Sequence, residues 1–512
     1  MALDWSDGYV TEIDYNFGYY GELNPLRADL ALATMGFVPP GPGDGCELGF
    51  GQGLSINIHA ASGAVSWWGN DFNPVQAGFA REMAAASGAR SELSDEAFFD
   101  FCARDDLPDF SFIGLHGIWS WISDTNRKTI TDFIRRKLKV GGVLYVSYNV
   151  DTGWAPSIPL RNLLVNHSAV MSAPGSPIVS RIDEALKFAE DLEKVNPAFF
   201  RANTPALARL NSMKGLQRNY LAHEYFNKDW RPMSFSEMDS WMSDAKMSYA
   251  CSANYLELVP GIGLTPDQQS FISGFQDVVF RETVRDFVLN QQFRRDYWIK
   301  GGRKITNLER HNYLLVQRVL LIKDCDSVAL NVKGPQGEAV LAENIYRPVL
   351  SAMAEKQPIS IYSLAHVLRE EGVNIDQLIE CLLVLIGKGD VVPVREKNLA
   401  ANAKKHTDRL NAYFFERARS GAEIAYLASP LTGGGINVGR FQQLFLLAIS
   451  KGRKSPDDWA GFAWEILSSQ NQIIMKDGVA LRSAEDNICE LRRQAKEFLE
   501  RDICLLKTLQ IA

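Results

Sequence analysis

The fold of this chain is decided by the stretch Glu47-Leu48-Gly49-Phe50-Gly51-Gln52-Gly53, with Asp71 at the end of the next apolar run. Its three alternate glycines let a chain that leaves a buried strand turn sharply and bring bare backbone against a nucleotide-like ligand. The N-terminal N–H groups of the following helix point at the same ligand. Dinucleotide folds place their third glycine one position later, where this chain has Leu54, and phosphate-binding loops need a Gly-Lys-Ser/Thr step, which is absent. What remains is the pattern Glu-x-Gly-x-Gly-x-Gly, with Asp71 positioned for ribose hydroxyls.

Three further strand patterns follow in order. Residues 65–71 are an apolar run that ends in Gly-Asn-Asp, and residues 110–117 end at the carboxyl edge where open α/β sheets bind ligands. Residues 143–149 read as a buried strand with polar groups at its end. Strand and helix patterns alternate from Gly45 to about Asn149, as a doubly wound sheet requires. Together with these strands, the glycine pattern resembles that of class I methyltransferases that use S-adenosylmethionine, so we predict a Rossmann-like α/β fold.

Length and composition limit the remaining possibilities. The chain has 512 residues, enough for two to four domains, with 54 basic and 61 acidic side chains and a net charge of −7. This balance argues against a dominant surface for nucleic acid or anionic membrane. Seven cysteines without a C-x-x-C pair predict buried thiols, and no metal site is expected. The acidic N-terminus and the short apolar runs predict no membrane insertion, and we expect a cytoplasmic protein.

The chain divides into an aromatic N-terminal part, a methyltransferase domain, a winged-helix-like domain and a mainly helical C-terminal domain, at residues 1–44, 45–303, 304–400 and 401–512. The N-terminal aromatics either close over an adenosine as a lid or pin the N-terminus to the core as a hydrophobic clasp. Residues 293–302 alternate as a strand and are the candidate for a last, antiparallel strand of the sheet. Residues 397–405 are polar and predict a linker. Residues 429–435, Ser-Pro-Leu-Thr-Gly-Gly-Gly, interrupt the helical pattern of the last domain.

Two further groups of residues narrow the resemblance. They are Trp119-Ser120-Trp121 after His116-Gly117, and His223-Glu224-Tyr225 with Arg231-Pro232. With them the chain resembles the bacterial class I methyltransferases that bear a so-called methyltransferase regulatory domain, here residues 223–302. That group includes rickettsial outer-membrane-protein lysine methyltransferases. The resemblance covers roughly residues 10–303.

The resemblance implies S-adenosylmethionine as cofactor and S-adenosylhomocysteine as product. Glu47 and the glycines would bound the methionine part, Asp71 would take the ribose hydroxyls, and Phe72 would lie beside the adenine. Asp95 and Glu96 would lie near the adenine amino group, and His116 next to the reactive methyl. With the lid aromatics included, the expected cofactor residues are Tyr15, Tyr20, Glu47, Gly49, Phe50, Gly51, Gly53, Asp71, Phe72, Asp95, Glu96 and His116.

The expected catalytic residues follow from the chemistry of methyl transfer. A sulfonium methyl is already a strong electrophile, so the main task is in-line placement of the acceptor with water excluded. A lysine or hydroxyl acceptor must lose a proton, for which His116 or His223 is the natural type of base; each is otherwise a hydrogen-bonded structural residue. Tyr148 and Asn149 are candidate substrate contacts.

Two pairs of side chains have alternative interpretations. Trp119, a candidate catalytic residue, forms with Trp121 either an apolar wall that desolvates the acceptor or part of a packed sheet face. Arg294 and Arg295 either bind an acidic substrate group or are solvated charges on an exposed strand edge, which is the interpretation we favour.

Methyl transfer to a protein side chain is the leading hypothesis, with lysine supplied by the resemblance. A glycan, another cell-envelope precursor or a small molecule is the alternative acceptor. The chain has Leu115-His116-Gly117-Ile118 where many amino-directed methyltransferases carry Asn/Asp-Pro-Pro-Tyr/Phe, so a nucleic-acid acceptor is disfavoured.

A second alternative is a cofactor-sensing regulator that reads DNA with the third helix of the winged-helix-like domain. That helix, residues 375–385, is acidic and apolar, which disfavours such a role. We therefore expect a protein or glycan partner and no nucleic acid, with a homodimer through the C-terminal domains as one arrangement.

Overall fold

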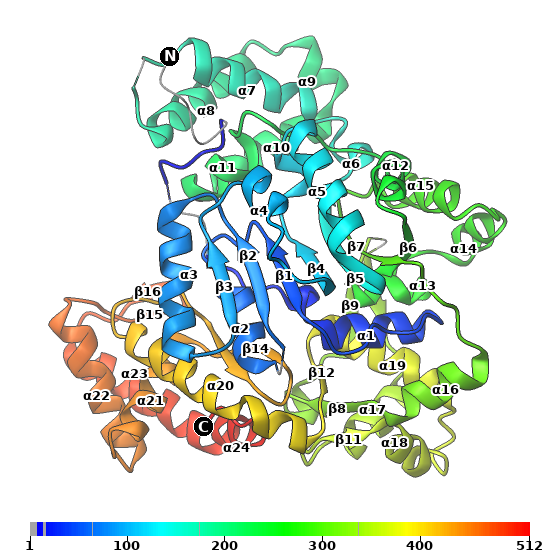
Figure 1. Cartoon of the computed structure of the whole chain (residues 1–512). Helices are drawn as coiled ribbons and strands as arrows, with labels where there is room; N and C mark the ends of the chain where they lie inside the picture. The colour runs from blue at the N-terminus through cyan, green and yellow to red at the C-terminus, as the bar shows by residue number, and fades with distance from the viewer. Residues whose placement is uncertain (1–7, 14–16, 64, 174, 336) are drawn as a thin grey trace.

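The computed structural model describes residues 8–13, 17–63, 65–173, 175–335 and 337–512 (Figure 1). Tyr15, expected in the lid, lies outside the described residues. At the centre is a seven-stranded sheet in the order β3-β2-β1-β4-β5-β7-β6. Its strands are β1 (Gly45–Leu48), β2 (Trp67–Asn70), β3 (Ser91–Ser94), β4 (Phe110–Leu115), β5 (Leu138–Asn149), β6 (Met247–Ser252) and β7 (Phe293–Lys300).

The predicted strands and their directions are confirmed. Strands β1 to β5 run parallel, and β7 pairs antiparallel with both β5 and β6. The order of the strands reverses between β1 and β4, which opens a crevice at their carboxyl ends. This is the Rossmann-like sheet of class I methyltransferases.

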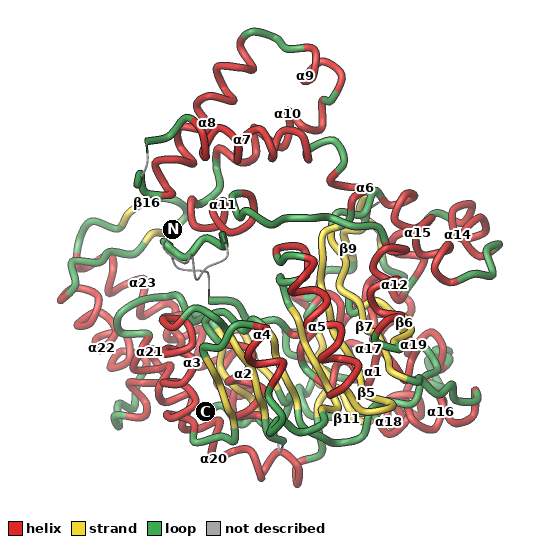
Figure 2. The backbone as a smooth tube through the Cα atoms, turned by 45° about the horizontal axis from the view of Figure 1, so that its top comes forward, coloured by secondary structure: helices red, strands yellow, loops and turns green. Residues whose placement is uncertain are grey.

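Helices cover both faces of the sheet (Figure 2). One face packs against α1 (Pro25–Thr34), α2 (Leu54–Ser62) and α3 (Pro74–Ser87), and the other against α4 (Phe98–Ala103), α5 (Asp124–Lys137) and α12 (Phe235–Asp244). Because side chains of a strand alternate between faces, Phe112 joins the first layer while Ile113 joins the second. Asn24 and Asn73 cap α1 and α3, each with a proline in the first turn, which is a start signal readable in the sequence.

A helical insertion follows β5 and has its own hydrophobic cluster, at the top of Figure 1. It consists of α6 (Asp151–Trp154), α7 (Ile158–Val170), α8 (Ile178–Lys194), α9 (Ala198–Ala202), α10 (Thr204–Lys214) and α11 (Arg218–Tyr225). Its last helix leads into a loop that returns to the carboxyl ends of β4 and β5. There the backbone N–H of Arg231 donates to the carbonyl of Ser120, and that of Met233 donates to the carbonyl of Asn149.

After β6 come η3 (Tyr255–Leu258), α13 (Pro260–Gly263), α14 (Pro266–Ser273) and α15 (Val278–Leu289), and after β7 comes α16 (Asn307–Val316). The next region contains β8 (Arg318–Leu321), the hairpin β9 (Asn331–Gly334) and β10 (Gly337–Val340), α17 (Glu343–Ala352), β11 (Ile359–Ser360), α18 (Ile361–Leu368), α19 (Ile375–Lys388) and β12 (Val391–Val394). Three helices and a three-stranded sheet in the order β11-β8-β12 make up this region, for which the sequence predicts a winged-helix-like domain. The wing itself is not confirmed, because β12 leads directly into the helix α20 (Lys397–Arg417). The linker predicted at 397–405 is therefore wrong, and the boundary drawn at residue 400 falls inside this helix.

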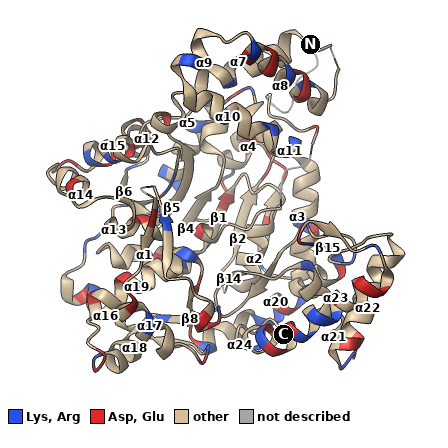
Figure 3. Ribbon diagram, turned by 180° about the vertical axis from the view of Figure 1, so that it is seen from behind, with Lys and Arg blue, Asp and Glu red and all other residues tan. Residues whose placement is uncertain are grey.

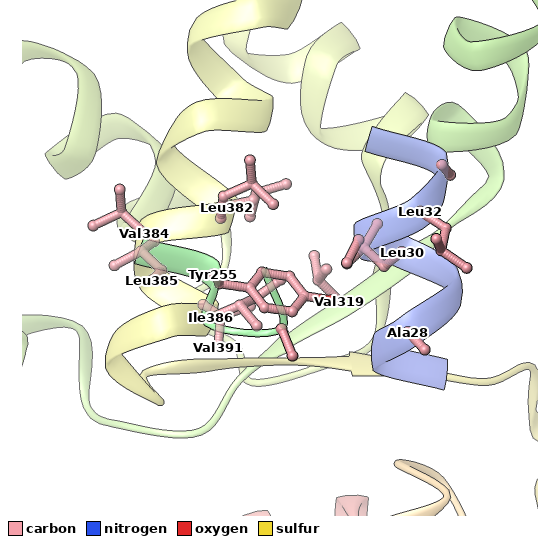
Figure 4. Packing of buried hydrophobic residues seen from close by; sticks show 14 of the residues in the cluster. Ala28, Leu30, Leu32, Tyr255, Val319, Leu382, Val384, Leu385, Ile386 and Val391 are labelled. Carbon is pink, nitrogen blue, oxygen red and sulfur yellow. The ribbon is translucent and has the colours of Figure 1, made fainter. Parts of the chain in front are cut away.

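The helix predicted to read DNA in the alternative hypothesis, α19, is part of the core. Figure 4 shows its side chains Leu382 and Ile386 gathered with Leu30 of α1 around the ring of Tyr255. Eight consecutive or near-consecutive residues of α19 are buried, from Leu378 to Ile386. Most of this helix is enclosed, and its exposed residues include the acidic Asp376 and Glu380, which disfavours a role in reading a DNA groove.

The C-terminal region lies against the outer side of α2 and α3. It contains α20, the hairpin β13 (Tyr426–Ser429) and β14 (Gly434–Asn437), α21 (Arg440–Ser450), α22 (Pro456–Ser469), β15 (Met475–Lys476), β16 (Val479–Ala480), α23 (Ala484–Glu497), η5 (Phe498–Asp502) and α24 (Ile503–Thr508). Leu54 and Ile58 of α2 belong to its hydrophobic cluster. All nine residues of α2 are consequently buried, since the sheet covers one side and the C-terminal region the other.

The peripheral helices carry charges of both signs, with basic and acidic residues interspersed along them (Figure 3). Within the described part of the chain, no helix combines the length and apolarity needed to cross a membrane. The seven cysteines are free, but Cys489 and Cys504 are exposed and Cys325 is half-buried, so the prediction of uniformly buried thiols is wrong.

Candidate functional site

The glycine turn between β1 and α2 adopts a conformation that side chains disfavour. Gly49, Gly51 and Gly53 have φ angles of 68°, 58° and 73°, in the left-handed region. A Cβ at Gly49 would lie 2.4 Å from Cδ1 of Ile118. One at Gly53 would lie 2.4 Å from Cβ of Ala80. The glycines are therefore required both for the bend and for the close packing around it.

Two acidic residues flank this turn. One carboxylate oxygen of Asp71 accepts from the backbone N–H of Gly51 at 2.8 Å, and the other accepts from that of Asn73 at 3.0 Å. Glu47 is buried, and its Oε2 has no hydrogen-bond partner among the described residues. A buried carboxylate oxygen without a partner is a place where a ligand hydroxyl or ammonium group can bind.

Burial also changes the titration of these acids. Desolvation raises the pKa of Glu47 to about 8, and the nearby charge of Asp71 adds to the rise. Desolvation raises the pKa of Asp71 to about 7, against the effect of its two backbone donors, which lower it. A positively charged ligand would favour the ionised form of both groups.

A cavity of about 200 Å³ opens in front of the turn. The expected cofactor residues that line it are Tyr20, Glu47, Gly49, Phe50, Gly51, Gly53, Asp71, Phe72 and His116. Asp95 and Glu96 do not line it. Asp95 instead pairs with Arg81 at 2.7 Å and Glu96 with Arg104, while the neighbouring Ala97 faces the cavity.

His116, at the end of β4, forms the wall opposite the turn. Its ring stacks on that of Tyr20, with centroids 3.5 Å apart and an interplanar angle of 20°. Its Nδ1 lies 2.7 Å from the hydroxyl of Tyr145. Desolvation lowers the pKa of His116 to about 4, so the imidazole is neutral at pH 7. Next to it, the hydroxyl of Ser147 accepts from the backbone N–H of Gly117 at 2.8 Å.

The other expected catalytic residues do not line the cavity. Trp119 is fully buried, and its Nε1 lies 3.3 Å from the sulfur of Met233. Tyr148 donates a hydrogen bond of 2.9 Å to Asp296. Asn149 is buried at the end of β5, where its backbone N–H donates to the hydroxyl of Ser120. For Tyr148 the physical reason is the alternation along β5, since Tyr145 and Ser147 face the His116 side and Tyr148 the opposite helix layer.

The other expected base, His223, is also buried away from the cavity. Its Nε2 lies 3.0 Å from the carbonyl oxygen of Ile13, which connects the regulatory segment to the N-terminal segment of the chain. Its ring lies 5.6 Å from that of Tyr9, which itself faces the cavity. His223 therefore contacts a residue of the cavity wall without lining the cavity itself.

Several lining residues are not among the cofactor and catalytic residues expected from the sequence. Gly8 and Tyr9 contribute from the N-terminus, Trp121 from the turn after β4, and Asn227 and Asp229 from the loop after α11. The side chain of Asn227 is already engaged, because it accepts from Val10 at 2.9 Å and donates to the carbonyl of His223 at 2.5 Å. Asp229 has no hydrogen bond or ion pair with any described residue, and it is half-buried. Tyr9 belongs to the expected aromatic N-terminal part and Trp121 to the expected apolar wall, whereas no motif in the sequence pointed to Asn227 or Asp229.

Arg294 lies in a buried network of acidic side chains. Arg294 is buried and pairs with Glu282, Asp286 and Asp296 at 3.0, 2.7 and 2.9 Å. Desolvation raises the pKa of Asp286 to about 7 in spite of the arginine. The prediction of a solvated charge on an exposed edge is therefore wrong for Arg294, because β6 covers that edge of β7.

Comparisons with known proteins agree with this architecture. The family described as "Predicted methyltransferase regulatory domain" matches residues 217–300, which include the loop that carries Asp229. The chain is 36% identical to the uncharacterized protein sll1526 of Synechocystis sp. over 515 residues, all of both chains. It is 24% identical to the uncharacterized protein RP789 of Rickettsia prowazekii over 62% of this chain and 58% of that protein.

A solved structure is similar over the same extent. The structure of PKMT2 from Rickettsia typhi in complex with AdoHcy superposes with a TM-score of 0.70 over 97% of this chain and 100% of that one, at 17% sequence identity. This likeness shows a shared fold that extends through the C-terminal region. The chain belongs to the same family as the Synechocystis protein, a family that combines the class I methyltransferase fold with a methyltransferase regulatory domain.

Proposed function

We propose that this protein is a methyltransferase that uses S-adenosylmethionine to methylate a protein side chain, the amine of a lysine. The observation that supports this most strongly is the cavity bounded by the three left-handed glycines and by Glu47 and Asp71. Its edges offer a ribose acceptor in Asp71 and an unpartnered carboxylate oxygen in Glu47. When bound, S-adenosylmethionine supplies an electrophilic methyl group on a positively charged sulfur.

Charge supports the choice of acceptor. The cavity is lined by the acidic side chains of Glu47, Asp71 and Asp229, of which Glu47 and Asp71 ionise more readily beside a cation, and no lysine or arginine lies among its described lining residues. Such a lining attracts cations and repels phosphorylated precursors. It therefore favours a lysine over an anionic glycan precursor, in agreement with the resemblance to lysine methyltransferases.

Each residue of the acceptor side has a part in this proposal. Asp229 attracts the lysine ammonium at the half-exposed edge of the cavity. The ammonium loses one proton to water before attack, because His116, with a pKa of about 4, is too weak a base to take it. Neutral His116 accepts a hydrogen bond from the amine, and Tyr20 and Trp121 exclude water from the line of attack.

Two measurements test the proposal. Calorimetry with S-adenosylhomocysteine should show binding to the wild-type chain, and weaker binding by more than about 1 kcal/mol for Asp71→Ala, which removes a charge-assisted hydrogen bond. Labelled methyl from S-adenosylmethionine, added to a lysate fractionated into protein, glycan, nucleic-acid and small-molecule pools, should appear in protein. Label confined to nucleic acid or to small molecules would reject the proposed acceptor.

A further inference from the structure

Two adjacent tyrosines in the N-terminal segment point to different parts of the molecule. Tyr20 lines the cavity and stacks on His116, whereas Tyr19 faces the C-terminal region. The backbone N–H of Tyr20 donates to the hydroxyl of Ser55 in α2 at 2.9 Å. Because the two residues share one short stretch of backbone, the position of Tyr19 sets where the ring of Tyr20 can lie.

Tyr19 packs against the glycine-containing hairpin β13–β14. Its ring lies 5.1 Å from that of Tyr426, and its hydroxyl lies 3.2 Å from Nε2 of the buried His59. A Cβ added to Gly434 would lie 2.3 Å from the hydroxyl of Tyr19, and one added to Gly435 would lie 3.1 Å from its ring. The glycines are thus required by the close approach of Tyr19.

The same hairpin holds the residue that starts α1. The side chain of Asn24 caps α1 by accepting from Leu26 at 3.0 Å, and it donates to the carbonyl of Thr432 at 3.0 Å. Both Asn24 and Thr432 are buried. The segment from Tyr19 to Asn24 is therefore fixed to the C-terminal region at both ends.

We propose that the hairpin β13–β14 is a positioning element for the cofactor cavity, with Gly434 and Tyr19 as its positioning residues. The hairpin fixes the position of Tyr19. Through the adjacent backbone, it thereby holds Tyr20 against His116 in the cavity wall. The Gly-rich stretch at 429–435 thereby contributes to a site whose ligand contacts lie about 400 residues earlier in the chain. The inference rests on the proposed function, since it takes the cavity to bind S-adenosylmethionine.

The test compares two glycine substitutions in the full-length chain. Gly434→Ala should raise the dissociation constant of S-adenosylhomocysteine by about tenfold or more, because displaced positioning residues have effects of this size. Gly461→Ala in α22 is the matched control, since its added Cβ meets no atom within 4 Å. Its dissociation constant should equal that of the wild type. In turnover, Gly434→Ala should raise KM for S-adenosylmethionine more than it lowers kcat.

Further variants separate positioning from general instability. Tyr19→Ala removes the ring that packs on the hairpin without introducing a clash, and it should also weaken binding of S-adenosylhomocysteine. Adding Tyr19→Phe to Gly434→Ala removes the hydroxyl nearest to the new Cβ and should recover part of the lost affinity. Wild-type affinity in both Gly434→Ala and Tyr19→Ala would overturn the positioning role. Absence of binding in the wild-type chain would instead reject the proposed function.

Discussion

The two walls of the cavity are built in different ways. The turn wall consists of Glu47 to Gly53 and Asp71, which lie at the ends of the adjacent strands β1 and β2. The opposite wall brings together Tyr20, His116 and Asp229, from the N-terminal segment, β4 and the loop after α11. The first wall depends on local backbone conformation, and the second depends on how distant segments pack. This difference explains why sequence patterns located the first wall but missed Asp229 of the second.

The largest expected effect tests the turn wall of the cavity. Gly49→Val places a side chain at a φ of 68° and within 2.4 Å of Ile118, so the dissociation constant of S-adenosylhomocysteine should rise by about 100-fold or more. Calorimetry measures it. Gly452→Val is the control, because its φ is 85° but its added Cβ meets no atom within 4 Å. Similar losses of affinity in both variants would show that backbone strain at any position, rather than this turn, disturbs binding.

The next effect concerns Glu47 in the protein without ligand. Burial holds the pKa of Glu47 at about 8, above its ordinary value, so the folded state binds a proton that the unfolded state releases between about pH 4.5 and 8. Stability from this group is therefore present at low pH and is lost as the pH rises through that window. Glu47→Gln should be more stable than the wild type by more than about 2 kcal/mol at pH 8, with little difference at pH 4.

Urea unfolding at the two pH values measures this difference. The same variant should bind S-adenosylhomocysteine more weakly, because it loses a carboxylate of the turn wall. A variant that is less stable than the wild type at pH 8 would show that Glu47 contributes to folding rather than to ligand binding.

A smaller effect tests whether Tyr148 lies outside the opposite wall of the cavity. Tyr148→Phe should lower the free energy of unfolding by about 1.5 kcal/mol, since the carboxylate of Asp296 loses a buried donor. The folded variant should keep kcat within about twofold, because the side chain does not line the cavity. Tyr362→Phe, at an exposed tyrosine, controls for loss of a hydroxyl. A large fall in kcat with normal stability would place Tyr148 at the acceptor after all.

The smallest effect concerns the acceptor itself. Asp229→Asn should raise KM for a lysine acceptor by about fivefold, because it removes one half-exposed charge from the cavity edge, while the affinity for S-adenosylhomocysteine stays unchanged. Steady-state kinetics, with the protein fraction that accepts the labelled methyl group as substrate, measures this KM. Asp95→Asn is the control, since that carboxylate pairs with Arg81 outside the cavity. If both variants behave alike, the effect belongs to overall charge.

Much of the fold was accessible from the sequence, and the failures share a cause. Strands β1, β2, β4, β5 and β7 were predicted because apolar runs and turn residues mark them locally. The polar stretch at 397–405 was taken for a linker, yet it begins α20, whose buried face packs on α2 and α3. Arg294 was taken for a solvated charge, yet β6 and three carboxylates enclose it. In both cases the environment comes from residues far away in the chain, which composition does not reveal.

The sequence by itself determined the glycine turn, the acid before it and the acid after β2, because short-range backbone sterics and strand-to-helix order require those residue types. Only the tertiary structure decided which neighbouring side chains face the ligand. Tyr145 supports His116 while Tyr148 joins a buried ion network, although both lie on the same strand. The reason is that a strand presents alternate residues to opposite layers, and the contents of each layer are set by segments hundreds of residues apart.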